Sequence, residues 1–195
     1  MKTKVILVLM LLAAITLQVS AQENENRFGV EFSLGASMAT NKLAGATLNP
    51  GFGGEAIFHY RFMPDLGIYG GWGWNRFGAE ESFAGDNACF EETGYVLGLQ
   101  YKRPIANTKT SWYLRAGGLY NHIETENAEG ENIHNTGHGP GWQLAGGFDF
   151  ALGKNWSLTP GIKFNSLTRE ADYENITRNF RYNYASVRFG ILKRF

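Results

Sequence analysis

The chain has 195 residues, which is enough for one domain, and its 18 Lys and Arg side chains balance 18 Asp and Glu side chains. A chain without excess positive charge gives no reason to expect a nucleic acid as a partner. The single cysteine, Cys89, excludes an intramolecular disulfide. We expect it to be a lone thiol, either buried or in a loop.

Residues 1–21 have the features of a secretory signal peptide. Two lysines precede an almost unbroken apolar run from Val5 to Leu17, and Val19-Ser20-Ala21 supplies the small residues that a signal peptidase requires. The run is short for a membrane-spanning helix, which needs about 20 residues, so an uncleaved helical anchor is the weaker alternative. Cleavage would leave residues 22–195 as one domain with two more acidic than basic side chains.

Apolar and polar residues alternate with a period of two through most of this domain. Phe28, Val30 and Phe32, for example, alternate with Gly29 and Glu31. Such alternation predicts β-strands with one apolar face. Eight segments share it, each near the ten residues that a tilted strand needs to cross a bilayer: 27–38, 52–62, 66–74, 94–102, 112–121, 142–152, 156–165 and 185–191.

The connections between these segments alternate in length. The long polar ones are 39–51, 77–92, 122–140 and 166–181, and the shorter ones are 63–65, 103–111 and 153–155. Long loops at one end and short turns at the other are typical of a β-barrel in the bacterial outer membrane. An even number of strands then places both termini at the short-turn end, which faces the periplasm.

Aromatic residues gather near both ends of the predicted strands. At the short-turn ends lie Phe28, Phe62, Tyr101, Trp112, Phe150, Trp156 and Phe195. Near the long-loop ends lie Trp72, Trp74, Tyr120, Trp142 and Tyr184. Two such belts match the two membrane interfaces, where an amphipathic ring is favoured. Pro160 interrupts this regularity, because proline removes a donor from the strand ladder, and we expect a bulge or a later strand start there.

Three segments resemble the outer-membrane β-barrel domain family, whose small members are similar to the outer-membrane protein A and X barrels. They are RFGVEFSLGASMAT from Arg27, PGFGGEAIFHYRF from Pro50, and the final ASVRFGILKRF. The resemblance implies an all-β fold: a closed, eight-stranded, antiparallel, up-and-down transmembrane barrel. It also implies contact with outer-membrane lipids and lipopolysaccharide, and a monomer in the bacterial outer membrane.

The end of the chain carries the sharpest part of the resemblance. In the family, a final strand with alternating apolar residues and a terminal aromatic is the signal that the barrel-assembly machinery reads, and Phe189, Ile191 and Phe195 match it. Lys193 departs from the pattern, since an apolar residue is more usual there. A single lysine near the interface can extend its ammonium group toward water.

The face opposite the apolar residues predicts the contents of the barrel. An eight-stranded barrel is just wide enough for its own side chains to fill the interior, and buried charges must be paired. We therefore expect an ionic plug, with Arg188 as a partner of Glu31 on the closing strands. The predicted network consists of Glu31, Glu55, Arg61, Arg115, Asp149, Lys163 and Arg188, with Glu92 and polar Gln100, Asn121 and Gln143 beside it.

The long loops are acidic, and two of them are conceivable cation sites. Their carboxylates are Glu80, Glu81, Asp86, Glu91, Glu92, Glu124, Glu126, Glu129 and Glu131, followed by His134 and His138. Carboxylates suit calcium, and imidazoles suit zinc or copper, but the spacing matches no defined motif. We favour solvated loops without a metal or other cofactor.

Four functional classes stay open, and the sequence favours the first. A plugged barrel with a structural or surface-interaction role fits the balanced interior charges, whereas a narrow channel would need a path through them. A lipid A-modifying enzyme would need a Ser and a His side by side, which the positions of His59, His122, His134 and His138 do not indicate. A soluble lipocalin-like barrel would place its large apolar residues inside.

Overall fold

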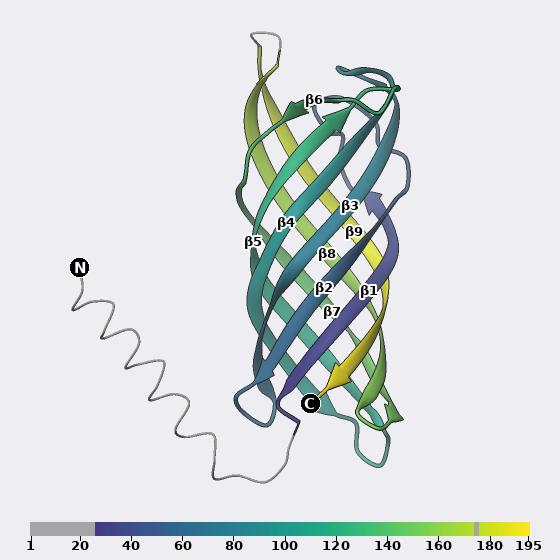
Figure 1. The fold of residues 1–195 in the computed structure, drawn as a ribbon, viewed down its shortest axis with the longest axis vertical. Helices are drawn as coiled ribbons and strands as arrows, with labels where there is room; N and C mark the ends of the chain where they lie inside the picture. Colours follow the sequence, from purple (N-terminus) through teal and green to yellow (C-terminus); the bar gives the residue numbers. More distant parts are fainter. Residues whose placement is uncertain (1–25, 174–175) are drawn as a thin grey trace, which may run out of the picture.

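The computed structural model describes residues 26–173 and 176–195 and shows an all-β barrel (Figure 1). Eight long strands form its wall: β1 (Phe28–Ala39), β2 (Gly51–Arg61), β3 (Leu66–Ser82), β4 (Gly85–Pro104), β5 (Thr110–Glu126), β7 (Gly139–Gly153), β8 (Trp156–Tyr173) and β9 (Ile176–Arg194). The short β6 (Asn132–Asn135) pairs with β5 at the upper end of the barrel.

Pairing between the first and last strands closes the wall. Each of the eight wall strands pairs antiparallel with its neighbours along the chain, and β1 also pairs with β9 from Gly29↔Arg194 to Ala39↔Tyr184. Closure removes the free strand edges that a bilayer cannot hydrate. The predicted closed, eight-stranded, up-and-down barrel is therefore confirmed.

Several strands continue well beyond the predicted segments. β3 and β4 contain 17 and 20 residues and are joined by a turn in which Ser82 pairs with Gly85. The predicted long loop 77–92 is thus a two-stranded extension of the wall. Much of the predicted loop 166–181 is likewise strand, because β8 and β9 pair from Trp156↔Lys193 up to Tyr173↔Ile176.

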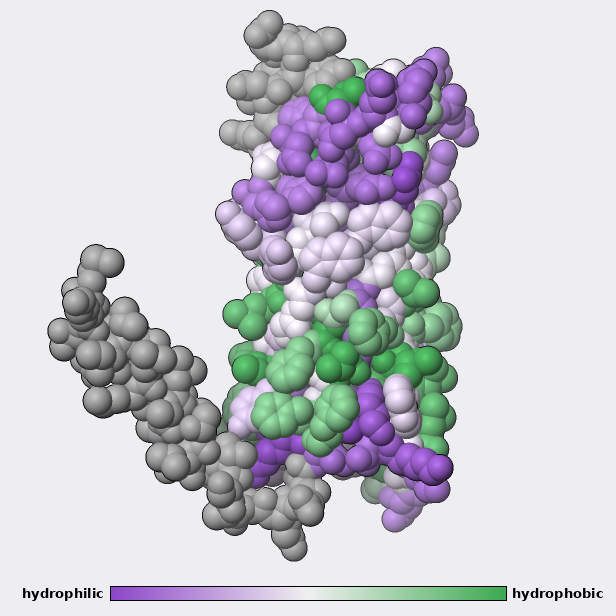
Figure 2. Space-filling view, in the orientation of Figure 1, coloured by the Kyte–Doolittle hydropathy of each residue, from purple (hydrophilic) through white to green (hydrophobic). Residues whose placement is uncertain are grey.

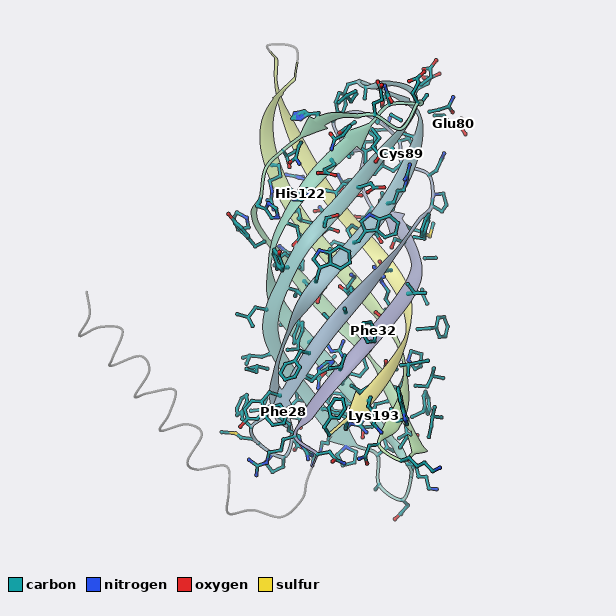
Figure 3. The ribbon with its side chains drawn as sticks, in the orientation of Figure 1. Phe28, Phe32, Glu80, Cys89, His122 and Lys193 are labelled. Carbon is teal, nitrogen blue, oxygen red and sulfur yellow. The ribbon has the colours of Figure 1, made fainter. Side chains whose placement is uncertain are left out.

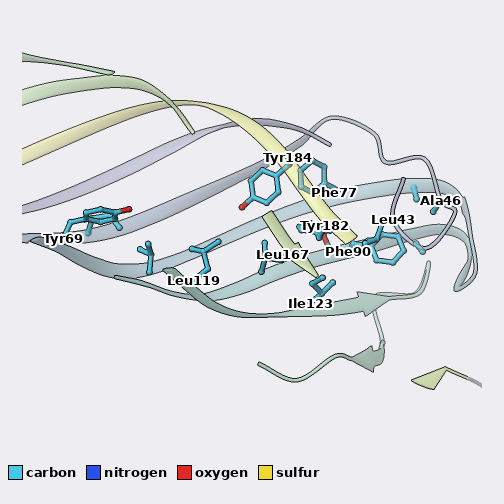
Figure 4. Packing of buried hydrophobic residues seen from close by; sticks show 14 residues of the cluster. Leu43, Ala46, Tyr69, Phe77, Phe90, Leu119, Ile123, Leu167, Tyr182 and Tyr184 are labelled. Carbon is cyan, nitrogen blue, oxygen red and sulfur yellow. The ribbon is translucent and has the colours of Figure 1, made fainter. Parts of the chain in front are cut away.

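The β1–β2 connection folds into the upper mouth of the barrel, and its tip is a tight turn. Leu43 and Ala46 exchange backbone hydrogen bonds of 2.9 and 2.8 Å, with Gly45 at a φ of 92°. Leu43 is fully buried against Phe77, Phe90 and their neighbours. This segment, predicted as a polar loop, therefore supplies part of an apolar lid, which Figure 4 shows from close by.

The exposed apolar side chains lie on the outward face of the wall, at the alternate strand positions that the sequence pattern predicted. Space-filling representation shows them as a belt, with a polar band above it at the end where the β3–β4 hairpin lies (Figure 2). The most exposed members are Phe32, Leu34, Met38, Phe52, Tyr95, Leu97, Leu99, Leu114, Tyr120, Leu152, Ile162 and Phe189. An exposed apolar belt of this kind suits a lipid environment and is opposite to the arrangement of a soluble lipocalin-like barrel.

Tyr184 does not belong to the upper aromatic belt. Its side chain is only 1 % exposed and points into the barrel, where it contacts Phe77 and Tyr182. The parity explains the error, because Val187 is outward-facing and 53 % exposed, and residues three apart on a strand lie on opposite faces.

The irregularity expected at Pro160 is milder than predicted. β8 begins at Trp156, and Pro160 pairs with Phe189 of β9 without a register shift. On the β7 side, the paired residues pass from Gly147↔Gly161 to Phe150↔Leu158, so the ladder skips the proline and keeps its register. The register shift of this hairpin lies at its turn instead, between Ala151 and Gly153.

Inward-facing glycines make room for large aromatic side chains inside the narrow wall. A Cβ placed on Gly98 would lie 2.8 Å from Cε1 of Tyr69 and 2.3 Å from the Ala116 carbonyl oxygen, and one on Gly117 would lie 2.5 Å from the Tyr69 hydroxyl. Tyr69 is 1 % exposed and crosses the interior at this level. The glycines of β4 and β5 therefore set how much aromatic volume the barrel accepts.

We predict that Gly98→Ala lowers the free energy of unfolding by about 1–3 kcal/mol, because the new methyl group overpacks the interior. Gly118→Ala is the matched control, since a Cβ there meets nothing within 4 Å. Unfolding of both variants in guanidinium, with the protein in lipid vesicles, measures the difference. Equal stability of the two variants would contradict this description of the interior packing.

Candidate functional site

The lower interior is organised around Glu31 of β1. Arg115 Nη2 lies 2.5 Å from Glu31 Oε2 and His59 Nε2 lies 3.0 Å from the same oxygen, while the Thr159 hydroxyl donates to Oε1 at 3.1 Å. Arg115 also donates from Nε to Gln100 Oε1 at 2.8 Å. All of this carboxylate's partners come from other strands, so the cluster ties distant parts of the wall together.

The middle of the interior is organised around Glu55 of β2. Its Oε1 accepts from Lys163 Nζ at 2.6 Å and from Gln143 Nε2 at 3.1 Å. Gln143 Oε1 in turn accepts from the Tyr69 hydroxyl at 3.2 Å. A cavity at this level, lined by Glu55 and Lys163 among others, has a volume of about 10 Å³, which is roughly the space of a single water molecule.

Asp149 of β7 pairs two cations near the short-turn end. Lys102 Nζ lies 2.6 Å from Asp149 Oδ2, and Arg194 donates to the same oxygen. Neither Lys102 nor Arg194 was among the predicted network residues. The parity could have found both of them, because Gln100 and Arg188 on the same strands face inward.

The predicted pairing of Arg188 with Glu31 is wrong. The β1–β9 register places Glu31 opposite Leu192 and Arg188 opposite Gly35, so two pleats separate the two charges along the strands. Arg188 instead donates from Nη2 to Asn75 Oδ1 at 3.3 Å, and its Nε and Nη1 have no hydrogen-bond partner among the described residues. Arg61, the remaining predicted member, lines a cavity at the short-turn end.

The interior charges are not balanced, contrary to prediction. Lys102, Arg169 and Arg194 join the four predicted cations, whereas the carboxylates are the predicted Glu31, Glu55, Asp149 and Glu92. Glu92 is hydrogen-bonded by Tyr184 and Asn121. Arg169 is satisfied by backbone carbonyl oxygens, including those of Asn121 at 2.9 Å and Pro140 at 2.6 Å. The described interior therefore holds more cations than carboxylates.

Apolar side chains form a buried cluster in the upper mouth above this polar interior. The cluster joins Leu43 and Ala46 from the β1–β2 connection to inward residues of the wall (Figure 4). Its fully buried large members are Tyr69, Phe77, Phe90, Ile123, Leu167, Tyr182 and Tyr184. Among the described residues, this cluster fills the upper part of the interior with closely packed side chains.

Two histidines meet on the outer surface near the loop end. His122 Nδ1 lies 3.0 Å from His138 Nε2, and His122 Nε2 lies 3.3 Å from Glu124 Oε1. Figure 3 labels His122 on the outside of the wall. The imidazole of His59 is held by Glu31 and that of His122 by Glu124 and His138, so neither of these two is positioned on a serine hydroxyl.

The outer surface around these histidines is predominantly acidic. Arg76 bridges two of its carboxylates, with Nη1 at 2.9 Å from Glu91 Oε1 and Nη2 at 3.0 Å from Glu126 Oε2. Cys89 is a half-buried free thiol on β4 beside them, rather than in a loop. Among the residues that the structure describes, no group of three or more His, Cys, Asp or Glu is arranged to hold a metal ion.

The sequence matches the family model described as "Outer membrane protein beta-barrel domain" over residues 7–191. The chain belongs to this family. No helix in the described part of the chain is long and apolar enough to cross a membrane. No curated protein is significantly similar in sequence.

Solved outer-membrane barrels share the fold of this chain. Neisserial surface protein A (NspA) is 16 % identical with a TM-score of 0.64, and the match covers 86 % of this chain and 97 % of that one. OprG from Pseudomonas aeruginosa is 12 % identical with a TM-score of 0.59, covering 87 % and 96 %. Ail from Yersinia pestis, in complex with the heparin analogue sucrose octasulfate, is 17 % identical with a TM-score of 0.51, covering 87 % and 99 %.

We predict that Arg115→Met destabilises the barrel by about 3–5 kcal/mol, because it leaves Glu31 buried without its cation. Adding Glu31→Gln to that variant removes the stranded charge and should restore a large part of the loss. Arg103→Met, an exposed substitution near the end of β4, is the control. Chemical unfolding in lipid vesicles measures the native protein, both single variants, the double variant and the control, and additive losses in the double variant would contradict the pairing.

Proposed function

We propose that this protein is a sealed, monomeric barrel of the bacterial outer membrane that acts at the cell surface through its loop end. The observation that carries the proposal is the combination of a filled interior with a rigid extension above the apolar belt. The β3–β4 hairpin, the upper part of β5, β6 and the turn between β5 and β6 form that extension. Strand pairing holds the hairpin, β5 and β6 in place.

The filled interior argues against general transport. Glu31 and Glu55 are paired with Arg115 and Lys163 across the lumen. Moving an ion through this region would require breaking a buried ion pair, which is costly in a low-dielectric interior. The apolar lid that contains Leu43 would then have to open as well.

The charge of the extension indicates the chemistry of its partner. Its carboxylates are Glu80, Glu81, Asp86, Glu91, Glu124, Glu126, Glu129 and Glu131. Complementary potentials speed association and disfavour partners of like charge. We infer a partner with a cationic surface. Sucrose octasulfate, the heparin analogue in the Ail complex, is a polyanion, and this acidic extension would repel it.

The same proposal includes the orientation and assembly of the chain. The described N-terminal end and the C-terminus lie together at the short-turn end (Figure 1), which we place in the periplasm after removal of residues 1–21. Phe189 and Ile191 face outward on β9, and Phe195 is 59 % exposed, so all three are accessible to the barrel-assembly machinery. Lys193 lies with its Nζ 5.1 Å from the Trp156 ring centre, as expected for a lysine at the interface.

We predict that the purified protein gives no stable conductance in planar bilayers, and that Arg188→Ala behaves in the same way. Insertion is checked by heat-modifiable migration on a denaturing gel, which is expected for a resistant barrel. A stable ohmic conductance that increases in Arg188→Ala would overturn the sealed interior.

We also predict that the protein in phosphatidylcholine nanodiscs binds immobilised polylysine and does not bind heparin. Glu80→Gln combined with Glu81→Gln should weaken polylysine binding several-fold, because it removes two exposed charges from the extension. Asp65→Asn removes one charge at the opposite end and should leave the binding unchanged. Equal weakening of polylysine binding by the Glu80/Glu81 double variant and by Asp65→Asn would contradict the inferred partner chemistry, and so would binding to heparin.

A further inference from the structure

A cavity of about 380 Å³ opens at the short-turn end of the barrel. It lies among the first residues of β1 and β3 and the last residues of β2, β4 and β9, at the end that carries the labels Phe28 and Lys193 in Figure 3. Its volume falls within the range of small-molecule sites. We call it the vestibule, and neither the sealed interior nor the acidic extension accounts for it.

Cationic side chains dominate the vestibule. Arg27, Arg61, Lys102 and Arg194 line it, and Asp65 is the one carboxylate among its described lining residues. Asp149 pairs with Lys102 and Arg194 from the side of the interior. Among the described residues around the vestibule, four cations stand beside two carboxylates. A concave surface lined by one sign of charge concentrates ligands of the opposite sign, and guanidinium groups bind phosphate and carboxylate oxygens with two parallel hydrogen bonds.

His59 adds a buried polar group to the lining. It is 8 % exposed, and Glu31 holds its Nε2, while its Nδ1 has no hydrogen-bond partner among the described residues. A buried nitrogen without a partner costs free energy that a ligand can recover. As an imidazolium the ring donates from Nδ1 to an anionic oxygen, and as a neutral ring it accepts from the hydroxyl of a hydrogen phosphate.

We propose that the vestibule binds a compact phosphate-bearing anion. Its cations and His59 hold the phosphate oxygens, and the lipid-facing side chains Phe28, Tyr60 and Ile68 at its margin accept an apolar portion. The phosphate comes either from a soluble molecule or from a lipid headgroup of the adjacent leaflet. Binding of the anion does not depend on the proposed surface role of the loop end. Only the placement of the vestibule on the periplasmic side of the membrane rests on the proposed function.

Titration calorimetry with inorganic pyrophosphate tests the site directly, using the full chain in a non-ionic detergent at low salt. We expect saturable binding that weakens about tenfold in Arg61→Gln and in Arg27→Gln, because each removes a charge-assisted hydrogen bond. Lys109→Gln removes an exposed cation from the β4–β5 turn outside the vestibule and should leave the affinity unchanged. Absence of saturable heat, or equal effects of Arg61→Gln and Lys109→Gln, would overturn the proposal.

The same titration in nanodiscs distinguishes the two sources of phosphate. If a lipid headgroup is the natural ligand, phosphatidylglycerol nanodiscs should block pyrophosphate binding in the native chain, whereas phosphatidylcholine nanodiscs should allow it. If the ligand is soluble, both nanodiscs should allow it. Heat-modifiable migration verifies that each variant is folded. The conductance and polylysine measurements do not depend on anion binding in the vestibule. A negative result for the anion site can therefore be distinguished from a negative result for the proposed surface role.

Discussion

Pairing of β1 with β9 is the interaction on which the rest of the structure depends. It satisfies the backbone of both terminal strands, which a bilayer would otherwise leave without hydrogen-bond partners. It also fixes the parity of every strand, because a shift of one residue would exchange the lipid face and the interior. With Glu31 opposite Leu192, the wall strands present an apolar belt to the lipid, and the interior holds the charged pairs together with the buried apolar cluster.

That interior has three regions that follow one another along the barrel axis. Carboxylates clamped by cations from across the lumen occupy its lower and middle parts, with Glu31–Arg115 and Glu55–Lys163 as the closest pairs. Apolar and tyrosine side chains occupy the upper part, beneath the inward fold of the β1–β2 connection. The short-turn end is left open and cationic. The described interior of this barrel therefore has an apolar upper end, a charged middle and a cationic vestibule.

The sequence predicted the wall well because a period of two is a local property. Pairing across the lumen is not local, because Arg115 and Glu31 are 84 positions apart in the sequence. The stagger of the strands brings them together, and the alternation of apolar and polar residues does not encode that stagger. The extension was missed for another reason. Above the apolar belt the outward face of β3 and β4 carries polar residues such as Glu80 and Asn87, which resemble a loop in composition. The period of two continues on the inward face only, in Phe77, Ala79, Ala88 and Phe90. Tyr184 was misplaced because its position near a strand end was weighed above its parity.

The central claim is that closure places one face of every strand in lipid, and a nitroxide scan along β4 tests it most directly. Single labels at positions 94 to 102, introduced into the Cys89→Ser chain in lipid vesicles, report accessibility to oxygen, which concentrates in the bilayer. We predict a period of two, with high accessibility at Tyr95, Leu97, Leu99 and Tyr101 and low accessibility between them. Accessibility without that period, or with the opposite phase, would contradict the account.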